Sequence, residues 1–157
     1  MNDVAASLWP VAAEAGVGWV AMHMQGDPRT MQDEPRYDDV VGEVRSFLVE
    51  RAARARAAGV PEVWIDPGIG FGKTTDHNLS LLRHLDRLTD AGHPVLVGTS
   101  RKGFLGRLTG GAPVGDRLAA SVATAAWAAS RGATMVRVHD VAATVQAVRV
   151  VAEEVAA

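Results

Sequence analysis

Cysteine is absent from this chain of 157 residues. The chain can therefore form neither a disulfide framework nor a thiolate metal site, which fits a reducing compartment, and we expect the cytoplasm. A net charge of -2 provides no basic field for nucleic acid, and no apolar run approaches the length of a membrane span. The N-terminus also lacks a basic segment followed by an apolar one. We therefore expect neither nucleic acid nor a membrane as a partner.

Lysine is nearly absent as well. The chain has two lysines, Lys73 and Lys102, against fourteen arginines. Arginine supplies the positive charge of the helical segments, whereas both lysines fall in loops that follow predicted strands. A compact ammonium on a flexible stem suits a binding loop, and a pair of ordinary surface lysines is the alternative interpretation.

The residues that are present alternate between short apolar runs and longer helical patterns, at intervals of roughly thirty residues, which is typical of parallel βαβ units. Hydrophobic residues make up 48% of the chain and charged residues 22%, so we expect one folded α/β domain over residues 1–157. The predicted strands are 1–4, 19–24, 62–66, 94–100 and 134–140.

Four helices are predicted between and after these strands. The first begins at Asp38 or Asp39 as N-cap and ends near Gly59, and the second runs from near Asp76 to Gly92. The last two helices have the apolar faces Leu118, Val122, Ala125 and Ala129, and Val141, Val145, Val148, Val151 and Val155. We expect these faces to pack against the rest of the chain.

The chain begins abruptly, because neither a strand nor a helix precedes the stub at residues 1–4. We expect that an element is missing there. Four and a fraction βα units cannot close an eight-stranded barrel, and an open parallel sheet leaves edges that need cover. Either further elements or a pairing partner is therefore expected.

The third predicted strand leads into the sequence DPGIGFGKT from Asp66 to Thr74. Asp66 places a carboxylate at the strand tip, and the alternate glycines allow the backbone to approach a ligand closely. A phosphate loop of the type G-x-x-x-x-G-K-[ST] is disfavoured, because that spacing requires glycine at position 67, where Pro67 stands. We interpret the segment as a ligand-binding loop.

The last two predicted strands also end in cationic residues. Lys102 follows the fourth strand, and Arg137 and His139 lie two residues apart, on the same side of the fifth. An arginine fork suits a phosphate group, and a histidine beside it can donate a further hydrogen bond or carry a proton. Together with Asp66, these residues predict a pocket for a polar heterocycle beside a phosphate.

Five ordered segments resemble dihydropteroate synthase: NDV from Asn2, MHMQGDPRTMQ from Met22, DPGIGFGKT from Asp66, GTSRKGFLG from Gly98 and RVHDV from Arg137. The resemblance covers nearly the whole chain. It implies a partial barrel of the TIM-type (β/α)8 family, in which these strands are about the fourth to the eighth. The first three strands of that barrel are absent.

The resemblance also implies site residues. The implied pterin-binding residues are Asn2, Met22, Asp66, Gly98, Lys102 and Arg137. The pyrophosphate would bind at Arg137, Val138 and His139, and p-aminobenzoate would lie beside Phe71, Lys102 and Gly103. The catalytic roles would fall to Asp66, Lys102, Arg137 and His139. Sulfonamides mimic p-aminobenzoate in this family, and members often have serine or arginine where this chain has Gly103.

The implied reaction is a transferase step of folate biosynthesis. It condenses p-aminobenzoate with 6-hydroxymethyl-7,8-dihydropterin pyrophosphate, giving 7,8-dihydropteroate and pyrophosphate. Arg137, His139 and a substrate-bound Mg²⁺ would stabilise the departing pyrophosphate. The protein ligand of Mg²⁺ is expected in the absent first half, and no metal ligand is predicted here, because metal-ligand spacing is lacking among His77, His84 and His93. The isolated chain should therefore have negligible activity.

Partners follow from the same resemblance. It implies a homodimer through the late helices, and a complementing N-terminal half could restore the barrel. Two other functions stay open. A pterin-dependent methyltransferase shares the barrel, but it needs no pyrophosphate site, so Arg137 and His139 disfavour it. A non-catalytic paralogue or interaction module would keep the fold and use the open edge for docking.

Overall fold

The computed structural model describes the backbone of residues 1–156 and the side chains of residues 1–152. The side chain of Val155, which the sequence places on the apolar face of the last helix, lies outside the described residues.

Short parallel strands form the centre of the described chain. In chain order they are β1 (Asn2–Asp3), β2 (Trp19–Met22), β3 (Val63–Asp66), β4 (Leu96–Val97) and β5 (Met135–Val136). The pairings are β1-β2-β3 and β4-β5, and a parallel bridge between Ile65 and Val95 joins the two groups. Over the residues that the structure describes, no strand pairing joins β5 back to β1, so the sheet stays open.

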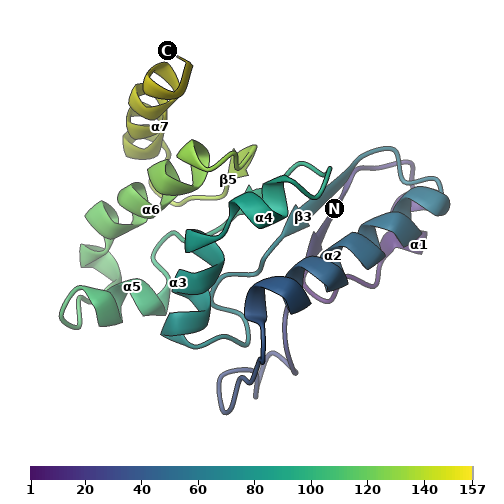
Figure 1. Cartoon of the computed structure of the whole chain (residues 1–157), viewed down its shortest axis with the longest axis horizontal. Coiled ribbons are helices and arrows are strands. Elements are labelled where there is room, and N and C mark those ends of the chain that lie inside the picture. Colours follow the sequence, from purple (N-terminus) through teal and green to yellow (C-terminus); the bar gives the residue numbers. More distant parts are fainter. Residues whose placement is uncertain (157) are drawn as a thin grey trace.

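Seven α-helices and one 3₁₀ turn connect and follow the strands. They are α1 (Trp9–Glu14), α2 (Val40–Ala57), α3 (Thr75–Arg83), α4 (Asp86–Thr89), α5 (Gly103–Leu108), η1 (Val114–Asp116), α6 (Leu118–Ser130) and α7 (Val141–Ala156). Figure 1 shows α2, α3 and α4 side by side over the strands, and α7 standing away from the body at the C-terminal end. No helix in the described range combines the length and the apolar character needed to cross a membrane.

The predicted strands are confirmed in position and order, but several are shorter than expected. The run predicted at 94–100 contributes only Leu96–Val97 and the bridge residue Val95 to the sheet, because Thr99 and Ser100 already belong to the loop that leaves the strand. In the same way β5 ends at Val136, before Arg137. The polar residues at the strand ends are therefore free to line a site instead of continuing the ladder.

The first two predicted helices each begin at a residue whose side chain caps the helix N-terminus. Asp39 caps α2, since its Oδ1 accepts a hydrogen bond from the Gly42 backbone N–H at 3.0 Å. Thr74 caps α3 in a reciprocal arrangement with His77, as the Thr74 Oγ1 accepts from the His77 N–H and the His77 Nδ1 accepts from the Thr74 N–H. The single helix predicted from Asp76 is divided, because the backbone at His84 leaves helical geometry before α4 begins.

The core lies between α2, α3, α4 and the strands. Its members are fully or almost fully buried and include Trp19, Val44, Leu48, Ile65, Leu81, Leu85 and Leu88. These residues come from both the helices and the sheet, so the strand ends rest on a packed base.

The faces predicted for the last two helices are partly wrong. In α6 the buried residues are Ser121, Ala125 and Ala128, whereas Leu118 is 45% exposed. In α7 Val141 and Val145 are 60% and 42% exposed. The reason is that α7 packs mainly against α6, so its valines face a cavity instead of a neighbouring element.

Candidate functional site

One large cavity lies at the carboxyl ends of the strands. Its volume is about 1110 Å³. Most predicted site residues line it: Asn2, Met22, Phe71, Gly98, Lys102, Arg137, Val138 and His139. Residues from opposite ends of the chain therefore meet at one edge of the sheet, as expected for a parallel α/β protein.

Arg137 connects the two ends of this edge. Its Nη1 donates to Asn2 Oδ1 at 2.7 Å, and its Nη2 donates to Asp66 Oδ2 at 2.9 Å. Gly98 allows this position, since a Cβ there would lie 3.0 Å from Arg137 Nη2. Asn2, Asp66 and Arg137, which are far apart in sequence, are thus brought into direct contact. In this structure the arginine fork binds the chain's own acceptors.

Asp66 is 1% exposed. Its Oδ1 accepts from the Gly68 N–H at 2.8 Å, so together with Arg137 both carboxylate oxygens have donors. Burial raises the pKa of Asp66, and the hydrogen bond from Gly68 and the charge of Arg137 oppose that rise. A carboxylate held in this way is rigid and favours a partner that donates two hydrogen bonds.

His139 is fixed from the neighbouring strand end. Ser100 Oγ accepts from the His139 backbone N–H at 3.1 Å and lies 2.9 Å from His139 Nδ1. This pairing leaves the Nε2 side of the ring without a partner among the described residues. Arg137 and His139 line the same cavity, but so does Val138 between them, and all three follow the end of β5 at Val136, so strand alternation is not the reason. Their convergence on an anion stays a prediction.

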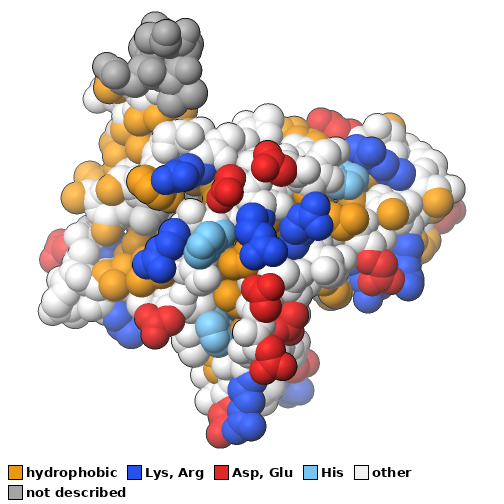
Figure 2. Space-filling model, viewed as in Figure 1, with side chains coloured by type: hydrophobic (Ala, Val, Ile, Leu, Met, Phe, Trp, Pro, Cys, Tyr) orange, Lys and Arg blue, Asp and Glu red, His pale blue; other side chains and the backbone are white. Residues whose placement is uncertain are grey.

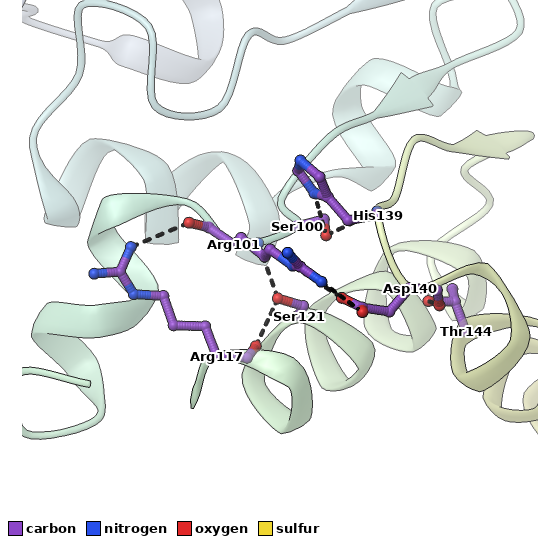
Figure 3. A network of polar contacts seen from close by, with 7 residues as sticks. All are labelled: Ser100, Arg101, Arg117, Ser121, His139, Asp140 and Thr144. Carbon is purple, nitrogen blue, oxygen red and sulfur yellow. Dashed lines mark hydrogen bonds and ion pairs between the residues drawn. The ribbon is translucent and has the colours of Figure 1, made fainter. Parts of the chain in front are cut away.

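Arg101 holds the loop after β4 (Figure 3). Its backbone is left-handed, with φ +57°, a conformation that costs a non-glycine residue about 1–2 kcal/mol. Three contacts offset this cost. The Arg101 N–H donates to Ser121 Oγ at 2.9 Å, its carbonyl accepts from Arg117 Nη1 at 3.1 Å, and its guanidinium binds Asp140 with two hydrogen bonds. Arg101 therefore fixes both neighbours, Ser100 and Lys102, relative to α6 and the start of α7.

Lys102 reaches across to the loop after β3. Its Nζ lies 3.9 Å from the centre of the Phe71 ring, and its stem passes Gly70, where a Cβ would come within 3.2 Å of Lys102 Cδ. Burial lowers the pKa of Lys102, and the charge of Asp66 opposes that change. Lys102 and Phe71 therefore form a cation–π wall of the cavity.

Two glycines of the loop after β3 have a structural role that the sequence did not predict. A Cβ at Gly68 would lie 1.8 Å from the His23 carbonyl oxygen, and one at Gly72 would lie 2.3 Å from the Gln25 carbonyl oxygen. Both residues have positive φ, +64° and +59°. These two glycines allow a close approach to the loop after β2, and their approach to a ligand stays a prediction.

Sequence reasoning missed His23 and misjudged Lys73. Lys73 is 1% exposed, and its Nζ lies 3.0 Å from His23 Nδ1. The same ammonium donates to the carbonyls of Gly68 at 3.1 Å and Phe71 at 2.9 Å. Burial lowers the pKa of Lys73 to about 7 and that of His23 to about 3, so the histidine is neutral. Lys73 is an internal support of the loop, whereas Lys102 lines the cavity.

Gly103 lies apart from the other predicted site residues. It lines a second cavity of about 640 Å³, which Lys102 also lines. As for a metal, no group of three or more His, Asp and Glu side chains that could hold an ion occurs in the described part of the chain. At the strand ends the one carboxylate of the site, Asp66, already binds Arg137. These residues therefore do not offer the oxygen ligands that Mg²⁺ requires.

Comparison with known proteins agrees with this geometry. The sequence pattern of the family described as "Pterin binding enzyme" matches residues 1–139. The dihydropteroate synthase of Neisseria meningitidis serogroup C is 47% identical over 157 residues, which are 95% of this chain and 56% of that protein. The chain thus spans about half the length of the curated relatives that it matches.

Solved structures give the same result. The dihydropteroate synthase of Thermus thermophilus, in a complex with 6HMPPP, superposes with a TM-score of 0.92 at 47% identity, covering 97% of this chain and 62% of that one. The same protein is known in a complex with 4-aminobenzoate. A sulfonamide complex of the Yersinia pestis enzyme has a TM-score of 0.94 at 40% identity, with 99% of this chain and 58% of that one covered.

Proposed function

The chain belongs to the pterin-binding enzyme family, and from that premise we propose that it supplies most of the active site of a dihydropteroate synthase. The reaction would join p-aminobenzoate to 6-hydroxymethyl-7,8-dihydropterin pyrophosphate. The observation that supports this most strongly is the contact of Arg137 with Asn2 and with the buried Asp66, because Asn2 and Arg137 line the large cavity. These groups can recognise a polar heterocycle and a phosphate at once.

We propose the following arrangement for the pterin. The ring has adjacent N–H groups, which suit the two oxygens of a rigid carboxylate in the same way as the arginine fork does. The pterin would therefore take the place of Arg137 on Asp66, with Asn2 at its edge and Met22 beside it. Lys102 Nζ, which lies over Phe71, would reach the polar edge of the ring.

Displaced from Asp66, Arg137 would turn to the pyrophosphate. His139 lines the same cavity, with its ring held by Ser100. The backbone N–H of Val138, between these two residues, would add a third donor. In the reaction the amine nitrogen of p-aminobenzoate attacks the methylene carbon, the bond from that carbon to the pyrophosphate oxygen breaks, and the amine loses a proton. Donors preorganised around the leaving oxygen stabilise the negative charge that develops there.

The rest of the barrel is also part of the proposal. The five strands would be the fourth to the eighth of a (β/α)8 barrel, which fits their parallel order and the share of the relatives that the chain covers. A complementing N-terminal half would close the sheet, and Mg²⁺ would arrive with the substrate pyrophosphate. A homodimer through the late helices and a cytoplasmic location stay predictions from the sequence.

A turnover assay tests this function. The chain is mixed with p-aminobenzoate, the pterin pyrophosphate and Mg²⁺, alone and together with the N-terminal segment of the Neisseria relative. We expect negligible dihydropteroate from the chain alone and clear formation of product with the added segment. Full activity of the chain alone would contradict the need for a partner. Inactivity in every pairing, with both substrates bound, would favour a non-catalytic paralogue.

A further inference from the structure

The second cavity carries an excess of positive charge. It shares Lys102 with the large cavity at the strand ends, which we call the pterin cavity. Its charged lining residues are Lys73, Lys102 and Arg107, against one carboxylate, Asp33. Lys73 is turned inward, to the backbone carbonyls that it binds. The charge available to a ligand in this cavity therefore comes from Lys102 and Arg107.

Arg107, on α5, is held in a defined position but keeps free donors. Its Nε donates to Thr75 Oγ1 at 2.7 Å, which ties the guanidinium to the start of α3. Among the residues that the structure describes, its Nη1 and Nη2 have no hydrogen-bond or ion-pair partner. A guanidinium that is already oriented loses less conformational entropy when it binds an anion.

Gly103 gives access to this guanidinium. A Cβ at Gly103 would lie 3.8 Å from Arg107 Nη1, so any side chain there would stand beside the donors. Glycine at this position leaves the space between the backbone of residue 103 and Arg107 empty. A small anionic group that passes Lys102 and Phe71 can therefore contact Arg107 directly.

We propose that Arg107 binds the carboxylate of p-aminobenzoate and determines the preference for an acid over a neutral analogue. The inference rests on the proposed function and on the family resemblance, which implies that p-aminobenzoate lies beside Phe71, Lys102 and Gly103. In that position the amine points to the pterin cavity and the carboxylate points to the second cavity. Arg107 is the cation that faces the carboxylate, and its fork matches the two oxygens.

The test compares p-aminobenzoate with p-aminobenzamide, which has nearly the same shape and no charge. Dissociation constants of both are measured by calorimetry for the natural chain and for Arg107→Met, Arg107→Lys and Arg83→Met. Arg83 is the matched control, because it is an exposed helical arginine outside both cavities. Each titration is done with and without 6-hydroxymethylpterin and pyrophosphate, so that the preference is measured even if the pterin does not bind.

The natural chain should bind the acid more tightly than the amide. Arg107→Met should raise the dissociation constant of p-aminobenzoate about tenfold, because one charge-assisted pair near the surface is lost. The dissociation constant of p-aminobenzamide should not change. Arg107→Lys should restore part of the preference, and Arg83→Met should behave like the natural chain. An unchanged acid-to-amide ratio in Arg107→Met, or no binding of the acid by the natural chain, overturns the inference. A chain that binds p-aminobenzoate but no pterin would contradict only the proposed function.

Discussion

Two buried ionisable side chains lie at opposite ends of the loop after β3. Asp66, at its start, accepts hydrogen bonds from Arg137 and from the Gly68 backbone N–H, while Lys73, at its end, binds backbone carbonyls inside the protein. Burial disfavours the charged form of both, so it raises the pKa of Asp66 and lowers that of Lys73. Under the proposed function Asp66 would bind the pterin, whereas Lys73 supports the loop from inside.

At Asp66, binding and stability should oppose each other. Because the folded chain keeps the Asp66 proton to a higher pH than the unfolded chain, stability falls as pH rises from the ordinary pKa of 3.8 through the raised pKa. Asp66→Asn does not titrate. We expect it to match the natural chain near pH 4 and to be more stable than the natural chain at pH 7, while pterin binding is lost. Urea unfolding at pH 4 and pH 7 measures the free energy of unfolding of both proteins. The same difference between variant and natural chain at the two pH values would contradict this prediction.

At Lys73 the change of stability with pH has the opposite sign. The folded chain loses this proton at a pH of about 7, whereas the unfolded chain keeps it to 10.5, so stability should rise with pH between about 7 and 9. Lys73→Met should reduce that rise and lower stability by about 2 kcal/mol at pH 7, since the carbonyls of Gly68 and Phe71 lose their donor. Urea unfolding of both proteins across this range tests it. An undiminished rise in the variant would show that another group is responsible.

Sequence reasoning at the residue scale identified groups but not their internal partners. The positions of Asp66, Lys102, Arg137 and His139 at strand ends follow from the βα alternation. His23 is different, because its partner Lys73 lies 50 residues away and only the packing of two loops brings them together. The available signal was that His23 directly follows the strand residue Met22, within a polar strand-end segment.

At the scale of elements, two loops are built as one unit. The loop after β3 packs on the loop after β2 through Gly68 and Gly72 and through Lys73. The Gln32 side chain adds a hydrogen bond of 2.6 Å to the Gly70 carbonyl, and the Tyr37 hydroxyl adds one of 2.8 Å to the Gly72 carbonyl. The position of Phe71 therefore depends on residues of both loops.

A glycine pair tests this packing. Gly68→Ala should lower the free energy of unfolding by more than about 3 kcal/mol, because strain at positive φ adds to a clash with the His23 carbonyl. Gly59→Ala has φ +88° but no atom within 4 Å, so only the backbone strain of about 1 kcal/mol should remain. Urea unfolding gives both values. Equal losses would show that the close approach costs nothing.

Element positions were predictable because hydrophobic period and capping residues are local signals. Asp39 and Thr74 begin their helices through hydrogen bonds within three residues. The buried faces of α6 and α7 were not predictable in the same way. An apolar stripe shows which residues can be buried, but the neighbour that buries them is set by the whole fold, and Val145 stays 42% exposed at the cavity wall.

At the scale of the molecule, an open sheet leaves apolar surface uncovered. Met1, Val4, Met135, Val141 and Val145 are each at least 40% exposed, and all line the large cavity. Figure 2 shows hydrophobic side chains over α6 and the lower part of α7. Apolar area of this kind is what a complementing half of a barrel would bury.

Substitution of two valines of α7 tests whether a complementing segment binds at the cavity or at any exposed apolar residue. Val145 lines the cavity, whereas Val150 is 66% exposed and lies outside it. Val145→Asp should weaken association with a complementing N-terminal segment by about tenfold, since burying an unpaired carboxylate is costly, and Val150→Asp should have little effect. Sedimentation equilibrium of the mixtures measures both. A similar loss in the two variants would contradict docking at the cavity.

The most direct test of the whole account is calorimetric titration of the chain with 6-hydroxymethyl-7,8-dihydropterin pyrophosphate and Mg²⁺. The natural chain is compared with Asp66→Ala, Arg137→Ala and the control Arg83→Met. We predict that the natural chain and the control bind, and that both site variants lose binding. A folded natural chain that does not bind, or equal binding by all four proteins, would contradict the claim that these strand ends hold the pterin and its pyrophosphate.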